Sequence, residues 1–232
     1  MSQKNSGAKF KARLFVVDDH PLICEGFKHL LGLHSDLEFC GEAHDSQIAL
    51  AEIEAKKPDL LILDLLENGN GLELIKASRS KHPCLRILVV SQLNELVYAE
   101  RTLRAGAHGY VMKRQSIPEV LNAIRSVLAG QLYVGSRLAT IALNQMLGKK
   151  TGKNKKNHGV ENLTDRELQI FHLLGAELGV SQISKELGLS VKTVETHREN
   201  IKHKLGFKSA RDLASHALKW IKRHGPSTAP AG

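Results

Sequence analysis

The chain has 232 residues, 42% of them hydrophobic and 25% charged, a composition typical of globular proteins that excludes collagen-like and intrinsically disordered chains. The net charge of +9 is uneven, because residues 1–148 carry 17 basic and 16 acidic side chains, whereas residues 149–232 carry 16 and 8. We therefore expect two domains, the second of which binds a polyanion unless its basic surface serves only solubility.

The cysteines and the apolar runs indicate the cellular compartment. Cys24, Cys40 and Cys84 are odd in number and far apart, which argues against a disulfide framework or a zinc site. No apolar run approaches the roughly 18 residues of a membrane helix, and the N-terminal residues lack the apolar stretch of a secretory signal. We expect a cytoplasmic protein without a membrane partner.

Residues 12–130 show the pattern of an α/β domain. Five short apolar runs predict strands, at residues 13–17, 37–43, 59–63, 86–90 and 108–112. Apolar residues with helical spacing follow each strand, at residues 20–33, 46–57, 71–81, 95–105 and 116–129. Ser116 and Glu119 form a capping box at the start of the last helix. Because strands that are apolar throughout are buried on both faces, we expect a doubly wound sheet of five parallel strands.

The fold class changes together with the charge. Residues 131–160 predict one amphipathic helix, at 136–147, followed by a flexible basic linker, because residues 148–159 hold five lysines and no apolar side chain. Residues 161–223 predict an all-α helix-turn-helix domain, with helices at 164–176, 179–187, 190–204 and 209–223. Residues 224–232 predict a disordered tail.

Polar side chains with related chemistry follow four of the five expected strands. Asp18 and Asp19 end the first strand, Asp64 the third, Ser91 the fourth and Lys113 the fifth. These strand ends meet at one edge of a parallel sheet, where clustered carboxylates need a cation and hard oxygen ligands suit Mg²⁺. A carboxylate beside Mg²⁺ and a lysine can accept a phosphoryl group. Each residue alone would be an ordinary cap, turn or surface residue, but their combination favours a site.

The motifs VVDDHP, PDLLILD, ILVVS and GAHGYVMK, spread over residues 13–130, resemble the receiver domain of two-component response regulators. The resemblance implies that a sensor histidine kinase transfers a phosphoryl group to Asp64. It implies that the ligands of Mg²⁺ are Asp18, Asp19, Asp64 and the backbone carbonyl of Leu66. It also implies that the phosphoryl contact and the switch residues are Lys113, Ser91 and Tyr110.

The segment after the acceptor departs from the receiver pattern. Asp64 is followed by LLENGNG, which lacks the usual proline and reaches Gly71 one residue early. This departure leaves the geometry of the metal site and the rate of phosphorylation open. The resemblance also places Leu66 and Leu93 beside the path of the water that hydrolyses the phosphorylated acceptor. Since both are apolar and cannot orient a water, we expect a long-lived phosphorylated state.

The helix expected at 190–204 has two contrasting faces. Ser190 is its expected N-cap, after a turn at Gly188. Val194, Ile201 and Leu205 fall on one face and should pack on the preceding helices. The opposite face holds only side chains that can hydrogen-bond, as a helix in the major groove requires, although an ordinary solvated face would look the same. The basic charge of the domain favours DNA.

The segment LTDREL…SVKTVETHRENIKHKLG resembles the LuxR-type DNA-binding domain over residues 161–222. From the polar face and this resemblance we expect a DNA-contacting set made of Lys192, Thr193, Glu195, Thr196, Arg198, Glu199, Lys202 and Lys204. Within this set, the cations off the centre of the face should reach phosphates.

Two further expectations concern the same domain. The family often has glycine where this chain has Glu177, so we expect the turn to be rebuilt around Gly179. The apolar arc of the last helix is wide, and Leu213, Ala217 and Trp220 are expected to pair two protomers on DNA, unless the arc is a fully used core face.

The combination resembles the NarL/FixJ class of response regulators and predicts a transcription regulator controlled by phosphorylation, not an enzyme. Its expected partners are double-stranded DNA, a sensor histidine kinase and a second copy of the chain on DNA. Two alternatives stay open. The shortened loop favours an atypical receiver whose DNA binding needs no phosphorylation. A Mg²⁺-dependent phosphotransferase or hydrolase would need a general acid or base, for which His20 is the one histidine near a strand end.

Overall fold

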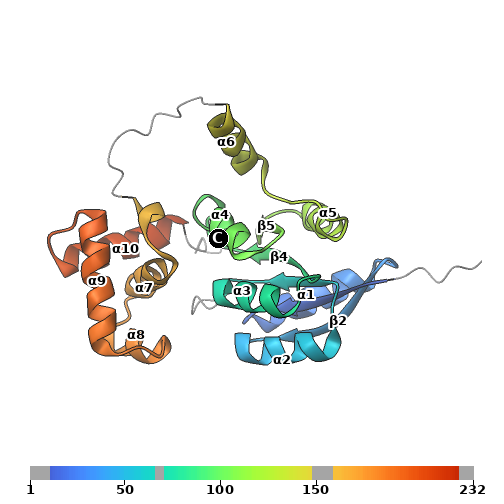
Figure 1. The fold of residues 1–232 in the computed structure, drawn as a ribbon, viewed down its shortest axis with the longest axis horizontal. Helices are drawn as coiled ribbons and strands as arrows, with labels where there is room; N and C mark the ends of the chain where they lie inside the picture. The colour runs from blue at the N-terminus through green and yellow to red at the C-terminus, as the bar shows by residue number, and fades with distance from the viewer. Residues whose placement is uncertain (1–10, 66–70, 148–158, 225–232) are drawn as a thin grey trace, which may run out of the picture.

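The computed structural model describes residues 11–65, 71–147 and 159–224. The N-terminal part is a five-stranded parallel sheet in the order β2-β1-β3-β4-β5, which confirms the predicted fold class (Figure 1). The strands are β1 (Ala12–Val17), β2 (Leu37–Ala43), β3 (Leu60–Leu63), β4 (Arg86–Ser91) and β5 (Gly109–Met112). The basic segment expected as a linker and most of the expected tail lie outside the described residues.

Helices cover both faces of this sheet. They are α1 (Pro21–Gly32), α2 (Ser46–Lys56), α3 (Gly71–Lys81), α4 (Glu95–Ala105) and α5 (Ile117–Leu128). Alternation along β1 explains the two layers, because Leu14 and Val16 join the core under α1 and α5, whereas Phe15 and Val17 join the core under α2, α3 and α4. The predicted capping box of Ser116 and Glu119 is present at the start of α5.

The C-terminal part is all helical (Figure 1). After α6 (Ser136–Met146) come a short 3₁₀ turn, η1 (Val160–Asn162), and four helices, namely α7 (Asp165–Gly175), α8 (Val180–Glu186), α9 (Val191–Leu205) and α10 (Ala210–His224). The apolar cluster under α2, α3 and α4 also contains Leu163 and Phe171 of the C-terminal part, so the cores of the two domains touch. Within the described residues, no helix is long and apolar enough to span a membrane.

The turn after α7 corrects one expectation. Glu177 itself adopts the left-handed conformation, with φ of 62°, and Gly179 has φ of −73° as the N-cap of α8. The turn is therefore not rebuilt around the glycine. The Leu178 N–H donates to the Leu173 carbonyl at 3.1 Å, and the Leu178 side chain packs against the core. These contacts at the helix end offset the strain of a non-glycine residue there.

The last helix corrects another expectation. Leu213 and Ala217 are fully buried, and α10 lies so close to α7 that a Cβ on Gly175 would meet the Ala217 carbonyl oxygen at 2.7 Å. The Trp220 ring packs on Phe171, with ring centroids 5.8 Å apart. In this conformation Leu213 and Ala217 belong to the core of their own domain, and neither is available to a second protomer.

Candidate functional site

Two aspartates come together at the carboxyl edge of the sheet because of strand register. Val17 of β1 pairs with Leu63 of β3, so the residues that follow them, Asp18 and Asp64, are neighbours. Both are buried. Lys113, which follows β5, places its Nζ 2.7 Å from Asp18 Oδ2 and 2.8 Å from Asp64 Oδ2. The structure thus joins groups from three strand ends in one ion-pair cluster whose carboxylates are buried.

Burial and the nearby cation act in opposite directions on the pKa of Asp64. Burial raises the pKa of Asp64, and the nearby Lys113 ammonium and Ser91 hydroxyl, which hydrogen-bond to the carboxylate, oppose that rise. Burial by itself would lower the pKa of Lys113, but the two carboxylates beside it raise its pKa overall. Lys113 therefore stays charged and can balance negative charge that develops on a neighbouring group.

The acidic edge also has the donor set of a hard divalent cation. One side-chain donor atom from each of Asp18, Asp19, His20 and Asp64 lies within 4.8 Å of the others. Three carboxylates beside one ammonium leave net negative charge, and their oxygens are the ligands that Mg²⁺ prefers. The residues therefore fit the expected ion. Leu66, expected to offer its carbonyl, lies outside the described residues.

Two histidines border the cluster. We expected His20 only as the acid or base of an alternative function, and we expected no role for His44. His20 Nδ1 lies 2.8 Å from Asp19 Oδ1 and 3.2 Å from Asp18 Oδ1, and its backbone N–H donates to Asp18 Oδ1 at 3.0 Å. His44 Nδ1 lies 2.9 Å from the Asp18 carbonyl oxygen. The adjacency of His20 to two aspartates is a visible signal in the sequence, whereas His44 follows the neighbouring strand β2 and is brought in by the sheet.

The expected switch residues form a chain of hydrogen bonds that leads from the acidic edge to α4. Ser91 is buried at the end of β4, and its Oγ accepts from the Leu93 N–H at 3.3 Å. The hydroxyl of Tyr110, a fully buried residue of β5, donates to the Leu93 carbonyl at 2.8 Å. The loop before α4 is therefore held by Ser91, which also hydrogen-bonds to Asp64, and by Tyr110.

The helix α9 presents the polar face expected of it. Val194, Ile201 and Leu205 are buried, and the N-cap is Ser190, whose Oγ accepts from the Thr193 N–H at 3.0 Å. The exposed members of the expected DNA-contacting set are Lys192, Glu195, Thr196, Glu199 and Lys204, and the half-buried members are Thr193, Arg198 and Lys202.

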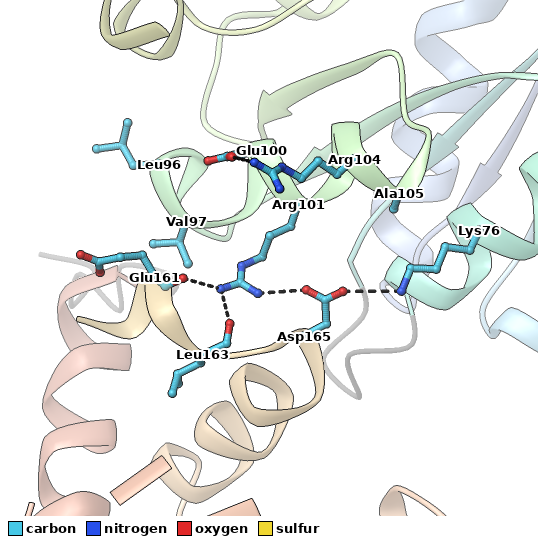
Figure 2. Close-up of a pocket in the computed structure, with 10 residues that line it drawn as sticks. All are labelled: Lys76, Leu96, Val97, Glu100, Arg101, Arg104, Ala105, Glu161, Leu163 and Asp165. Carbon is cyan, nitrogen blue, oxygen red and sulfur yellow. Dashed lines mark hydrogen bonds and ion pairs between the residues drawn. The ribbon is translucent and has the colours of Figure 1, made fainter. Parts of the chain in front are cut away.

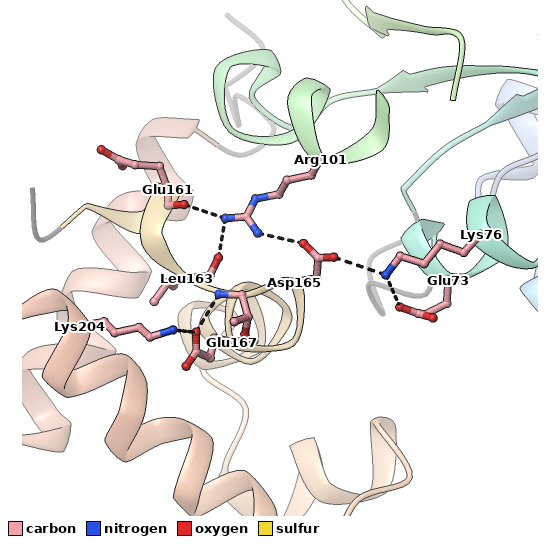
Figure 3. Close-up of polar contacts among 9 residues, drawn as sticks. Glu73, Lys76, Arg101, Glu161, Leu163, Asp165, Glu167 and Lys204 are labelled. Atoms are coloured by element: carbon pink, nitrogen blue, oxygen red, sulfur yellow. Dashed lines mark hydrogen bonds and ion pairs between the residues drawn. The ribbon is translucent and has the colours of Figure 1, made fainter. Parts of the chain in front are cut away.

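Several of these side chains already have partners within the domain. The Thr196 hydroxyl donates to the Lys192 carbonyl at 2.9 Å, and Lys202 pairs with Glu199 on the same helix. Lys204 Nζ lies 2.6 Å from Oε2 of Glu167, a buried residue of α7 that we did not expect to have a role (Figure 3). The ammonium of Lys204 is thus paired within its own domain. The position of Lys204 in the sequence does not predict this pairing.

Comparisons with known proteins agree with this geometry. Residues 14–125 match the family model of the response regulator receiver domain, and residues 161–217 match that of the bacterial regulatory proteins of the luxR family. The oxygen regulatory protein NreC of Staphylococcus aureus is 33% identical over 216 residues, which are 89% of this chain and 97% of NreC.

Solved structures resemble the whole described fold. RcsB from Salmonella enterica serovar Typhimurium, bound to the promoter rprA in the presence of the phosphomimetic BeF3-, has a TM-score of 0.67 and 22% identity over 90% of this chain and 98% of that one. A structure of two RcsB dimers bound to two parallel DNAs has a TM-score of 0.52 and 21% identity over 91% and 99%. At such identities the likeness concerns the fold.

Proposed function

This chain belongs to the response regulators that join a receiver domain to a LuxR-type DNA-binding domain, and we propose that phosphorylation of Asp64 by a sensor histidine kinase controls its regulation of transcription. The observation that carries the proposal is the cluster that the buried Asp18 and Asp64 form with the half-buried Lys113 at the carboxyl edge of the sheet. Such a cluster places a nucleophilic carboxylate beside a fixed cation.

The proposed transfer needs little more than positioning and charge. An oxygen of Asp64 attacks the phosphorus of a phosphohistidine, a P–O bond forms, and the P–N bond breaks toward the kinase histidine. Lys113 exchanges its contact with Asp64 for one with a phosphoryl oxygen, and Ser91 offers its hydroxyl to another. Mg²⁺, held by Asp18, Asp19, Asp64 and the Leu66 carbonyl, would neutralise charge on the transferring group.

We further propose that α9 enters the major groove of double-stranded DNA and that the protein binds DNA as a homodimer. The exposed polar face of α9, the excess of basic residues after residue 149, and the likeness to the DNA-bound RcsB dimers support this. Leu213 and Ala217 are not part of the proposed pairing surface. We place the protein in the cytoplasm, whose reducing conditions suit its free thiols Cys24, Cys40 and Cys84.

Incubation with acetyl phosphate and Mg²⁺, followed by intact-mass measurement, tests the proposal. We expect one added phosphoryl group, lost in Asp64→Asn. The matched control is Asp59→Asn, because Asp59 lies at the opposite end of β3 with its carboxylate bound to the Arg13 N–H. An unchanged mass in the folded wild type would favour the atypical receiver. Turnover of acetyl phosphate that persists in Asp64→Asn would favour the phosphotransferase or hydrolase.

A further inference from the structure

Three aromatic rings from three helices meet where the two domains touch. Tyr98 of α4 packs on His172 of α7 with ring centroids 5.6 Å apart, and His172 packs on Trp220 of α10 with centroids 5.3 Å apart. Both pairs are edge-to-face. The His172 ring therefore lies between the receiver domain and the last helix of the DNA-binding domain.

Ion pairs and hydrogen bonds also join the two domains (Figure 2). Arg101 of α4 donates to the Asp165 carboxylate at 2.9 Å and to the backbone carbonyls of Glu161 and Leu163 at 3.0 and 2.6 Å. Lys76 of α3 lies 3.5 Å from the other oxygen of Asp165. An open cleft of about 430 Å³ lies beside these contacts. The two domains therefore share a set of polar contacts and a set of aromatic contacts.

His172 is poorly placed to carry a proton. Within the described residues, its Nε2 is buried and has no hydrogen-bond partner. The His172 ring is half-buried, but a protonated imidazole has an N–H on both nitrogens, so the one at Nε2 would be a buried donor without an acceptor. Burial lowers the pKa of His172 to about 4.

The neighbours of the ring offer no charge that would reverse this effect. Tyr98 faces it from α4 and Trp220 from α10, and no charged residue contributes to the shift. The charged groups of the same interface, Lys76, Arg101 and Asp165, pair with one another.

We propose that acid weakens the contact between the two domains, because the buried Nε2 of His172, whose ring packs between Tyr98 and Trp220, has no acceptor for the proton of an imidazolium. Separation of the domains takes Tyr98 away and lets water reach the ring, so the separated form binds a proton more readily than the docked form. By linkage, a fall in pH then favours separation.

The sign and the size of the effect follow from the two protonation equilibria. A histidine whose pKa is lowered in the docked form gives docking a contribution that is complete above the ordinary value of 6.5 and is lost as pH falls toward about 4. Between about pH 7.5 and about pH 5.5, the ratio of separated to docked molecules should rise about tenfold. Carboxylates with ordinary pKa values stay ionised over this range.

Two measurements on the full chain test the proposal. In an NMR titration of the histidine rings, with His172→Gln to assign the resonance, His172 should stay neutral down to about pH 5.5. In Arg101→Ala, which loses the polar contacts of α4, it should titrate closer to 6.5. Small-angle X-ray scattering of Arg101→Ala should show the tenfold rise in separated molecules, and Arg101→Ala with His172→Gln should show none.

The control is His216→Gln in the Arg101→Ala background, because His216 packs on Phe171 and Phe207 inside its own domain. This variant should keep the rise. The proposal is overturned if wild-type His172 titrates near 6.5, if acid tightens docking, or if the rise persists with His172→Gln. Neither measurement uses DNA or a phosphodonor, so the result is independent of the function proposed above.

Discussion

The carboxylate of Glu167 binds the ammonium of Lys204 at 2.6 Å and so ties the first turn of α7 to the last turn of α9 (Figure 3). Oε2 of Glu167 also accepts from the Thr164 N–H at 2.7 Å, which closes the capping box of α7. Lys204 therefore supports the placement of the polar face of α9, in addition to any contact with DNA.

This relationship predicts opposite outcomes for two roles of Lys204. If the lysine positions α9, Glu167→Gln should weaken binding to the operator about tenfold, roughly 1.4 kcal/mol, with an unchanged dependence on salt. If Lys204 instead contacts a DNA phosphate once it leaves Glu167, Glu167→Gln should free its ammonium. Binding to the operator should then tighten, and its dependence on salt should become steeper. We expect the first result, measured by fluorescence anisotropy over a salt series. Lys202→Ala is the control and should flatten the salt dependence by about one unit.

Thr196 should read base edges. It is exposed on the polar face of α9, and its methyl and hydroxyl groups can contact a thymine methyl or a base acceptor. We expect Thr196→Ala to change the preferred sequence in a selection from random duplexes, with a discrimination loss of about 1–2 kcal/mol at one base pair. Thr196→Ser keeps the hydroxyl and should keep the hydrogen-bond part of the preference. An identical preferred sequence for wild type and Thr196→Ala would remove Thr196 from the groove-facing set.

Arg101 should matter for docking where its neighbour Arg104 does not. Both lie on α4, but Arg101 reaches three groups of the DNA-binding domain, whereas Arg104 pairs with Glu100 on its own helix. Arg101→Ala leaves the carbonyls of Glu161 and Leu163 and the Asp165 carboxylate with fewer partners. We expect the separated fraction, measured by small-angle scattering near neutral pH, to rise about tenfold or more in Arg101→Ala and to stay unchanged in Arg104→Ala. Equal effects would assign the docking to the aromatic contact alone.

The carboxyl edge of the sheet is predictable from the sequence because strand periodicity fixes both the strands and their ends. Asp18, Asp64 and Lys113 follow apolar runs, and parallel pairing then leaves them no other place. The faces of α9 are predictable for a similar reason, since Val194, Ile201 and Leu205 recur with helical spacing.

Contacts between helices far apart in the chain are not predictable in this way. Arg101 and Asp165 are 64 residues apart, and Glu167 and Lys204 are 37 apart, so no local spacing links them. Leu213 and Ala217 are a second case in which the sequence alone does not identify the partner of a side chain. An apolar arc on one helix has the same pattern whether it packs inside its own domain or against a second protomer, and only the position of α7 decides.

Glu177 should be a site where glycine stabilises the protein. It is exposed and has a φ of 62°, a conformation that costs a residue with a Cβ about 1 kcal/mol or more. We expect Glu177→Gly to raise the free energy of unfolding of the DNA-binding domain by about 0.5–1 kcal/mol. The increase is smaller than the strain that is relieved, because glycine also gives the unfolded chain more conformational entropy. Urea denaturation measures the change. Glu177→Ala keeps the Cβ and should bring no such gain.

The phosphorylated form should last minutes to hours, because the residue beside the expected water path cannot orient a water. Leu93 is half-buried against the core, and its backbone is fixed by Ser91 and Tyr110. A side-chain change there should therefore leave the loop in place. We expect Leu93→Glu combined with Leu66→Asn to accelerate loss of the phosphoryl group about tenfold, or ~1.4 kcal/mol, by holding a water for in-line attack.

The decay is followed by intact mass after the phosphodonor is removed. Leu96→Glu is the matched control, since Leu96 is 37% exposed in the first turn of α4, and it adds the same charge without facing Asp64. Its decay should equal that of the wild type. Decay of the wild type within seconds would show that Leu93 does not limit access of water. An equal acceleration by Leu96→Glu would assign the effect to charge at α4 and not to a water oriented by residue 93.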